Sequence, residues 1–108
     1  MIVKYGASIE RDAIVTNLKR LTNQIYKLLP NREEGVDWKK PLVTILEEFA
    51  GMDRLFFDHQ EILFSLMCKL EGLFTLDEKE KEQENFFVFR KTIFECLGLV
   101  NSLVTVCI

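Results

Sequence analysis

The single histidine of the chain, His59, is the first candidate for chemistry, because an imidazole can bind a metal ion or transfer a proton. Asp58 and Glu61 lie close to it and could supply carboxylate ligands. On a helix, however, Asp58 projects about 100° away from His59 and Glu61 about 200° away, so the three side chains cannot reach one ion. The Glu-x-x-His spacing of di-iron bundles is also absent, since Phe56 stands three residues before the histidine. We therefore expect a packed or partly exposed histidine.

Glu95 is the second candidate, because it stands in the most apolar part of the chain. Phe94, Cys96 and Leu97 surround it in sequence, and a carboxylate buried among them would be costly unless it were paired. Lys91 lies four residues earlier and could form an ion pair with it on one face of a helix. The pattern thus favours a solvated helix edge, and the alternative places Glu95 against a cavity or a partner subunit.

A group of basic residues could bind an anionic small molecule. Some of them lie near Asp37, where a helix is expected to begin and where its N-terminal end would attract negative charge. Glu33 and Glu34 interrupt the group, which favours an ordinary solvated surface instead. If the binding interpretation holds, an anionic metabolite or a nucleotide lies between subunits and contacts Lys19, Arg20, Arg32 and Lys40.

The three cysteines, Cys68, Cys96 and Cys107, are far apart and odd in number. No C-x-x-C pair occurs, so neither a disulfide framework nor a zinc site is indicated. They are typical of small buried side chains in a reducing compartment. The first twelve residues, 1–12, lack the long apolar core of a secretory signal. We expect a cytoplasmic protein.

The sequence contains no recognisable catalytic motif. There is no G-x-G-x-x-G, no P-loop and no G-x-S-x-G. Glu47 and Glu48 are adjacent, so their carboxylates point in different directions and do not form a matched acid/base pair. We expect no enzyme and no cofactor. An enzyme that uses Glu95 or His59 is a third hypothesis, and it predicts a buried polar pocket around one of them.

Composition and charge indicate one helical globular domain spanning residues 1–108. Hydrophobic residues make up 48%, with nine Phe and few Gly or Pro. The net charge of −3 resides in the segment Asp77–Glu84 (DEKEKEQE), and the rest of the chain is neutral. A neutral body with one acidic segment lacks the basic surface that binding to phosphates requires. We therefore expect no nucleic-acid partner.

The first half of the chain predicts two helices. Met1–Gly6 could be an arm or an edge strand, and Ser8 is expected to cap a helix that Pro30 ends. Asp37 is expected to cap a second helix, and Gly51 to end it in a left-handed conformation. The apolar seam of the first helix is Ile14, Leu18, Leu21, Ile25 and Leu28, and the apolar face of the second is Trp38, Leu42, Ile45, Leu46 and Phe49.

The second half predicts two more helices. A third helix is expected from Asp53 to about Phe74, and Asp77 could cap a fourth, with a flexible acidic loop as the alternative. From Phe86 onwards apolar residues occur on every side of the helical wheel, and Gly98 interrupts the run. The residues expected to form its main stripe are Phe86, Phe89, Ile93, Leu97, Val100 and Val104.

The apolar C-terminal segment has three interpretations. It could be a central helix, half of an oligomer interface, or a membrane anchor over 92–108. The anchor is disfavoured because Glu95 and Asn101 are expensive in hydrocarbon, so we expect no membrane partner. A helix apolar on all sides is difficult for three short neighbours to cover. We therefore expect a homodimer or higher oligomer, with an interface at Phe87, Phe94, Leu99 and Leu103.

The sequence thus predicts an all-α bundle of about four helices in which the helix at 86–104 is the most buried. The leading hypothesis for its function is a non-enzymatic protein–protein interaction module, a small oligomeric regulator or inhibitor. The alternative is a binding protein for an anionic small molecule or nucleotide between subunits. A phage-type inhibitor of a host system and a tail-anchored membrane protein are weaker alternatives.

Overall fold

The computed structural model describes residues 4–76 and 82–107, with side chains from residue 11 onwards. These residues form four α-helices, α1 (Lys4–Glu33), α2 (Lys39–Ala50), α3 (Gln60–Gly72) and α4 (Glu82–Cys107), and two single-turn 3-10 helices, η1 (Phe57–His59) and η2 (Leu73–Thr75). Helices α1 and α3 each pack against both α2 and α4, so the four form a ring of neighbours. The predicted all-α bundle of about four helices is confirmed.

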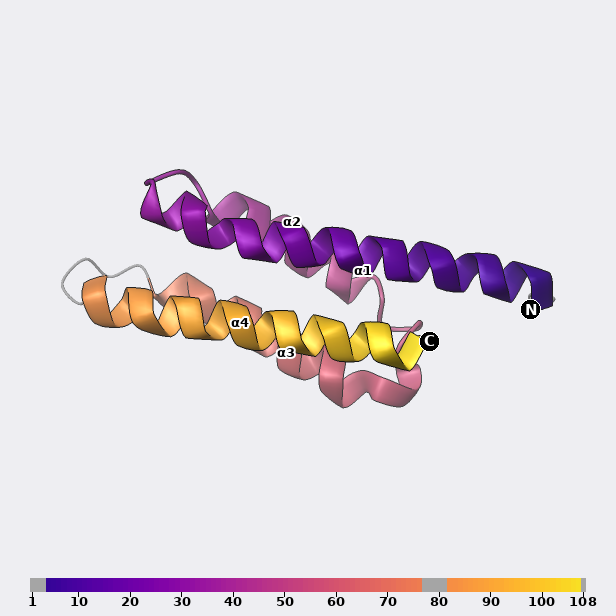
Figure 1. Ribbon diagram of the computed structural model, residues 1–108. Coiled ribbons are helices and arrows are strands. Elements are labelled where there is room, and N and C mark those ends of the chain that lie inside the picture. Colours follow the sequence, from indigo (N-terminus) through magenta and orange to yellow (C-terminus); the bar gives the residue numbers. More distant parts are fainter. Residues whose placement is uncertain (1–3, 77–81, 108) are drawn as a thin grey trace.

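Two helices of the bundle are long and two are short. Consecutive helices run in opposite directions, and the N-terminal turns of α1 extend beyond the C-terminal end of α4 (Figure 1). With 30 and 26 residues, α1 and α4 are about twice as long as α2 and α3, which have 12 and 13. The molecule measures 55 × 23 × 19 Å. The most extensive contact between two helices of the bundle is therefore the one between α1 and α4.

One apolar stripe of each helix forms a continuous core. The predicted seam of α1 is confirmed, because Leu18, Leu21, Ile25 and Leu28 are fully buried and Ile14 packs partly buried against them. On α2 the buried side chains are Leu42, Ile45 and Phe49, and on α3 they are Leu63, Leu66 and Leu70. Each such burial stabilises the fold by roughly 1.5–3 kcal/mol.

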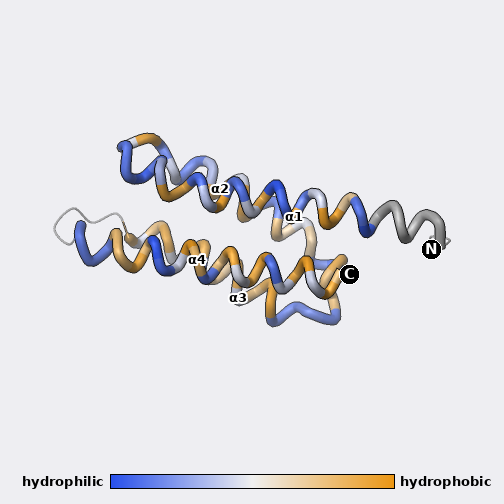
Figure 2. Tube along the Cα trace, viewed as in Figure 1, coloured by the Kyte–Doolittle hydropathy of each residue, from blue (hydrophilic) through white to orange (hydrophobic). Residues whose placement is uncertain are grey.

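Helix α4 buries a narrower stripe than its composition suggests. The predicted positions Phe89, Ile93 and Val100 are buried, but Leu97 and Val104 are only partly covered. Cys96 and Leu103 are buried in the core instead. Helix α4 packs against both α1 and α3, so its buried residues are those that face the space between these two helices. Hydrophilic residues alternate with hydrophobic ones along the helix (Figure 2).

The end of α1 differs from the prediction, because the helix continues through Pro30 to Glu33. Proline removes one backbone hydrogen bond, but in the last turn the remaining ones still form, and Glu34 N–H donates to the Pro30 carbonyl at 3.0 Å. The helix ends where Gly35 takes φ +74°. Gly35 N–H then donates to Arg32 O and Val36 N–H to Asn31 O, which is a Schellman motif.

The predicted cap at Asp37 is present. One carboxylate oxygen of Asp37 accepts hydrogen bonds from the backbone N–H groups of Lys39 and Lys40, at 3.0 and 3.3 Å. These are donors that the first turn of a helix otherwise leaves unpaired. The turn at Gly35 and this cap together fix the connection between α1 and α2.

Other predicted boundaries are wrong. Residues 4–6 are helical rather than an arm or strand, and Ser8 lies inside α1, because extending an existing helix adds one hydrogen bond per residue. Gly51 is right-handed, at φ −69°. Asp53 begins no helix but accepts a hydrogen bond from the Gln60 side chain, and α3 starts seven residues later. The predicted Asp77 cap lies outside the described residues.

Among the described helices, none has both the length and the apolar composition that crossing a membrane would require.

Candidate interaction surface

Three exposed aromatic side chains lie on the side of the bundle formed by α1 and α4. Tyr26 of α1 is 52% exposed, and Phe87 and Phe94 of α4 are 69% and 48% exposed. Tyr26 and Phe94 each follow a core residue, so they project about 100° from the buried stripe and meet edge to face, with ring centroids 6.5 Å apart. We call Tyr26, Phe87 and Phe94 the aromatic surface.

A groove of about 360 Å³ lies beside the aromatic surface, between α1 and α4. Its α4 wall carries Arg90, whose guanidinium lies 5.8 Å from the centroid of the Phe94 ring. Its α1 wall carries Glu33, which is exposed. The two walls therefore differ in charge. The groove residues that matter below are Tyr26, Pro30 and Glu33 from α1 and Phe86, Arg90 and Phe94 from α4.

The four predicted interface residues do not lie together. Phe87 and Phe94 are exposed and are seven residues apart, so they lie on one side of α4 about 10.5 Å apart along it. Leu99 is half-buried and packs against the core. Leu103 is fully buried inside the chain, where another molecule cannot reach it. Only Phe87 and Phe94 offer a large exposed surface to a partner.

The four predicted anion-binding residues are also dispersed. Arg20 of α1 donates to Glu48 of α2 at 2.6 Å, and Arg32 donates to Glu82 of α4 at 2.8 Å. The two arginines are twelve residues apart, or about 18 Å along α1. Lys19 is exposed on α1, and Lys40 is exposed in the first turn of α2. Within one chain they do not converge on a small ligand, because the helices hold them apart.

Arg32 is the most enclosed charged side chain involved in these pairs, with 5% of its side chain exposed. Its guanidinium lies 5.0 Å from the Phe89 ring centroid and 5.7 Å from that of Phe86. It also donates to the backbone carbonyl of Leu76 at 2.5 Å. Arg32 thus ties the end of α1 to the segment after η2 and to the start of α4.

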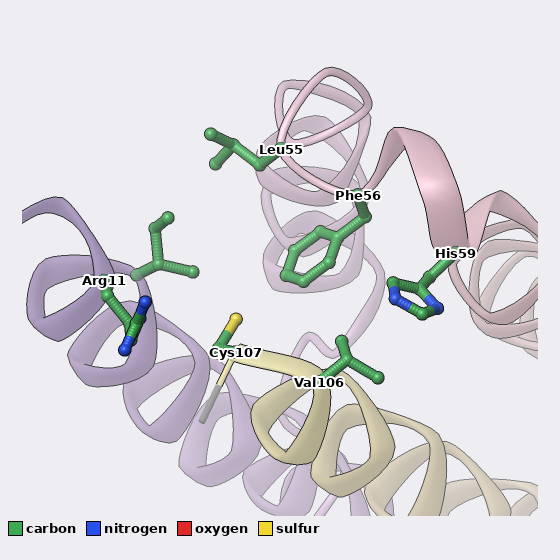
Figure 3. Close-up of a pocket in the computed structure, with 7 residues that line it drawn as sticks. Arg11, Leu55, Phe56, His59, Val106 and Cys107 are labelled. Carbon is green, nitrogen blue, oxygen red and sulfur yellow. The ribbon is translucent and has the colours of Figure 1, made fainter. Parts of the chain in front are cut away.

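A pocket of about 240 Å³ lies at the opposite end of the bundle, where α4 ends (Figure 3). Arg11 and His59 stand on opposite sides of it, and the Cys107 sulfur points inwards between them. Burial raises the pKa of the Cys107 thiol, and the nearby charge of Arg11 opposes that rise. The pocket is lined by Arg11, Ile14, Leu55, Phe56, His59, Val106 and Cys107.

His59 and Asp58 both belong to η1, whereas Glu61 lies in the first turn of α3, so the three residues do not share one regular helix. In the described part of the chain, no three His, Cys, Asp or Glu side chains are close enough to hold a metal ion. His59 lines the pocket together with Arg11, Cys107 and four apolar side chains.

Glu95 lies on a solvated helix edge, as the sequence favoured, but its partner differs from the prediction. Lys69 of α3, rather than Lys91, donates to it at 3.4 Å. Both side chains are more than one-third exposed. The interhelical pair forms because Glu95 projects from the side of α4 that faces α3.

The cysteines are three free thiols. Burial raises the pKa of the Cys96 thiol to about 12, and the nearby Glu95 carboxylate adds to the rise while Lys69 opposes it. Cys96 therefore stays protonated at neutral pH and acts as a small core side chain. Cys68 is exposed on α3.

The sequence interpretation missed Tyr26, Arg90 and Glu33 as surface-forming residues. Tyr26 has a sequence signal, because an aromatic residue directly after a seam position must project at the edge of the buried stripe. The position of Glu33 opposite Arg90 has none, since it depends on how α4 returns beside α1. Comparison of the chain with protein-family models, curated proteins and solved structures finds no match.

Proposed function

We propose that this chain is a non-enzymatic protein–protein interaction module, a small homo-oligomeric regulator or inhibitor that associates with itself through the aromatic surface. The observation that carries the proposal is the grouping of Tyr26, Phe87 and Phe94 in exposed positions on two neighbouring helices. Tyrosine, phenylalanine and arginine are enriched in protein interfaces, and Arg90 lies over the Phe94 ring. Burial of these rings against a partner would remove apolar area from water.

Mass measurement by light scattering tests the proposal. The unmodified protein should form a defined oligomer, and Phe94→Asp should shift it towards monomer, because a carboxylate in the interface would lose its hydration. Phe64→Asp is the matched control, since Phe64 is 53% exposed on α3, outside the aromatic surface. An oligomer that persists in Phe94→Asp would contradict the proposal, as would a monomer in the unmodified protein.

The proposal also includes a cellular compartment and a second protein partner. We place the protein in the cytoplasm, because three unpaired thiols are typical of a reducing compartment. After self-association, the outer faces of α2 and α3 are available to a different protein. The anion-binding alternative gains no support from the contacts, since Arg20 and Arg32 are each bonded to a glutamate of the same chain.

A further inference from the structure

We infer that the α1–α4 groove is occupied by a second copy of this chain, related to the first by a two-fold axis that runs along the groove. The inference rests on the proposed self-association and specifies its geometry. Its starting point is the charge of the two groove walls, which is negative at Glu33 on α1 and positive at Arg90 on α4.

A two-fold axis along the groove places α1 of each subunit over α4 of the other. Rotation about this axis exchanges the two walls and leaves each residue at its own level along the groove. Glu33 then faces the partner's Arg90, and Tyr26 faces the partner's Phe94. Because the interface is symmetric, each pairing occurs twice.

The levels of these residues along the groove fit the arrangement. Tyr26 and Phe94 are in contact and mark one level. Glu33 lies seven residues further along α1, at about 10.5 Å, and Arg90 lies four residues back along α4, at about 6 Å. Since α1 and α4 run in opposite directions, both displacements point the same way (Figure 1). The levels of Glu33 and of the partner's Arg90 along the groove therefore differ by about 4.5 Å, a distance that an arginine side chain can span.

The competing arrangement is an antiparallel pair of α4 helices in contact through Phe87 and Phe94. Its two-fold axis would cross α4 midway between these residues and would place Arg90 opposite the partner's Lys91. Two such contacts between like charges disfavour it. The groove arrangement avoids them and still covers Tyr26 and Phe94.

Charge reversal distinguishes the arrangements. In Glu33→Arg, each subunit would present a second guanidinium to the partner's Arg90, and in Arg90→Glu two glutamates would meet. Each single variant should raise the dissociation constant of the dimer by about tenfold, measured by sedimentation equilibrium. An equimolar mixture of the two variants should recover the original dissociation constant, because both pairings in the mixed dimer join opposite charges.

The control is Glu47→Arg, which reverses an exposed glutamate on α2 away from the groove and should leave the dissociation constant unchanged. Far-UV circular dichroism should show that all variants retain their helix content. If Phe94→Asp dissociates the dimer but the mixture does not recover it, or the single reversals have no effect, the two-fold axis along the groove is refuted and the proposed function stands. If the unmodified protein is a monomer, or Phe94→Asp leaves the dimer intact, both are refuted.

Discussion

Arg32 offers the sharpest test of what holds the bundle together, because a charged side chain is enclosed where three segments meet. The variant Arg32→Met keeps most of the apolar stem and removes the guanidinium. Its lost contacts are the two Phe rings, the Leu76 carbonyl and the carboxylate of Glu82. The local packing of Trp38, which contacts the Phe89 ring at 5.0 Å between centroids, depends on the same cluster.

The expected magnitude follows from these contacts. Each cation–π contact contributes about 1 kcal/mol, and a hydrogen bond from a charged donor to the Leu76 carbonyl contributes about 1.5 kcal/mol. The ion pair adds less than about 1 kcal/mol, because Glu82 is 55% exposed and solvent screens it. Methionine sulfur against the rings recovers up to about 1 kcal/mol. Arg32→Met should therefore lower the free energy of unfolding by roughly 2.5–4.5 kcal/mol.

Urea denaturation followed by circular dichroism measures the effect at a fixed protein concentration, since self-association also stabilises the fold. In a thermal melt of the same protein the Tm should fall by about 10–18 °C, at about 4 °C per kcal/mol. Lys69→Met is the control, because its pair with Glu95 is exposed on both sides and should contribute less than about 1 kcal/mol. A loss in Arg32→Met no larger than that in Lys69→Met would refute the argument from burial, and so would an equal loss in Glu82→Gln.

Three further variants test single features of the chain. Gly98→Ala should raise the free energy of unfolding by about 0.5–1 kcal/mol, because a Cβ there meets nothing within 4 Å; a loss of stability in denaturation would mean that another molecule packs on Gly98. Gly35→Ala should lower it by about 1–2 kcal/mol, since φ is +74°, and an unchanged urea midpoint would contradict the left-handed turn. Cys96 should make the protein less stable above pH 9, because the unfolded thiol ionises near 9 and the folded one near 12. The loss from this group is about 1.4 kcal/mol at pH 10, and Cys96→Ala should lack it; parallel stability profiles for the two proteins between pH 8 and 10 would contradict the buried thiol.

The sequence determined the features that depend on neighbouring residues along the chain. The seam from Leu18 to Leu28 is buried as its spacing predicts, because residues three and four apart share one side of a helix. Asp37 caps the backbone two and three residues later, which is a local hydrogen bond. The number of helices followed from these repeating patterns and from the turns between them.

Only the tertiary structure decided which side of α4 faces inwards. Periodicity identifies a buried face when polar residues mark the opposite one, but α4 has apolar residues on every side, so its neighbours select the stripe. This selection leaves Phe94 exposed and buries Leu103. The continuation past Pro30 is also tertiary, since the last turn of α1 is tied to α4 and to the chain before it through Arg32.

The candidate surface also depends on how α4 packs against the other helices. Glu33 and Arg90 are 57 positions apart in the chain, and no local pattern relates them. They face one groove because α4 returns antiparallel beside α1 after two shorter helices. Local spacing thus determined the helices and most of the core, whereas the distribution of exposed aromatic rings and charges between helices followed from packing, because side chains distant in sequence meet only after the bundle closes.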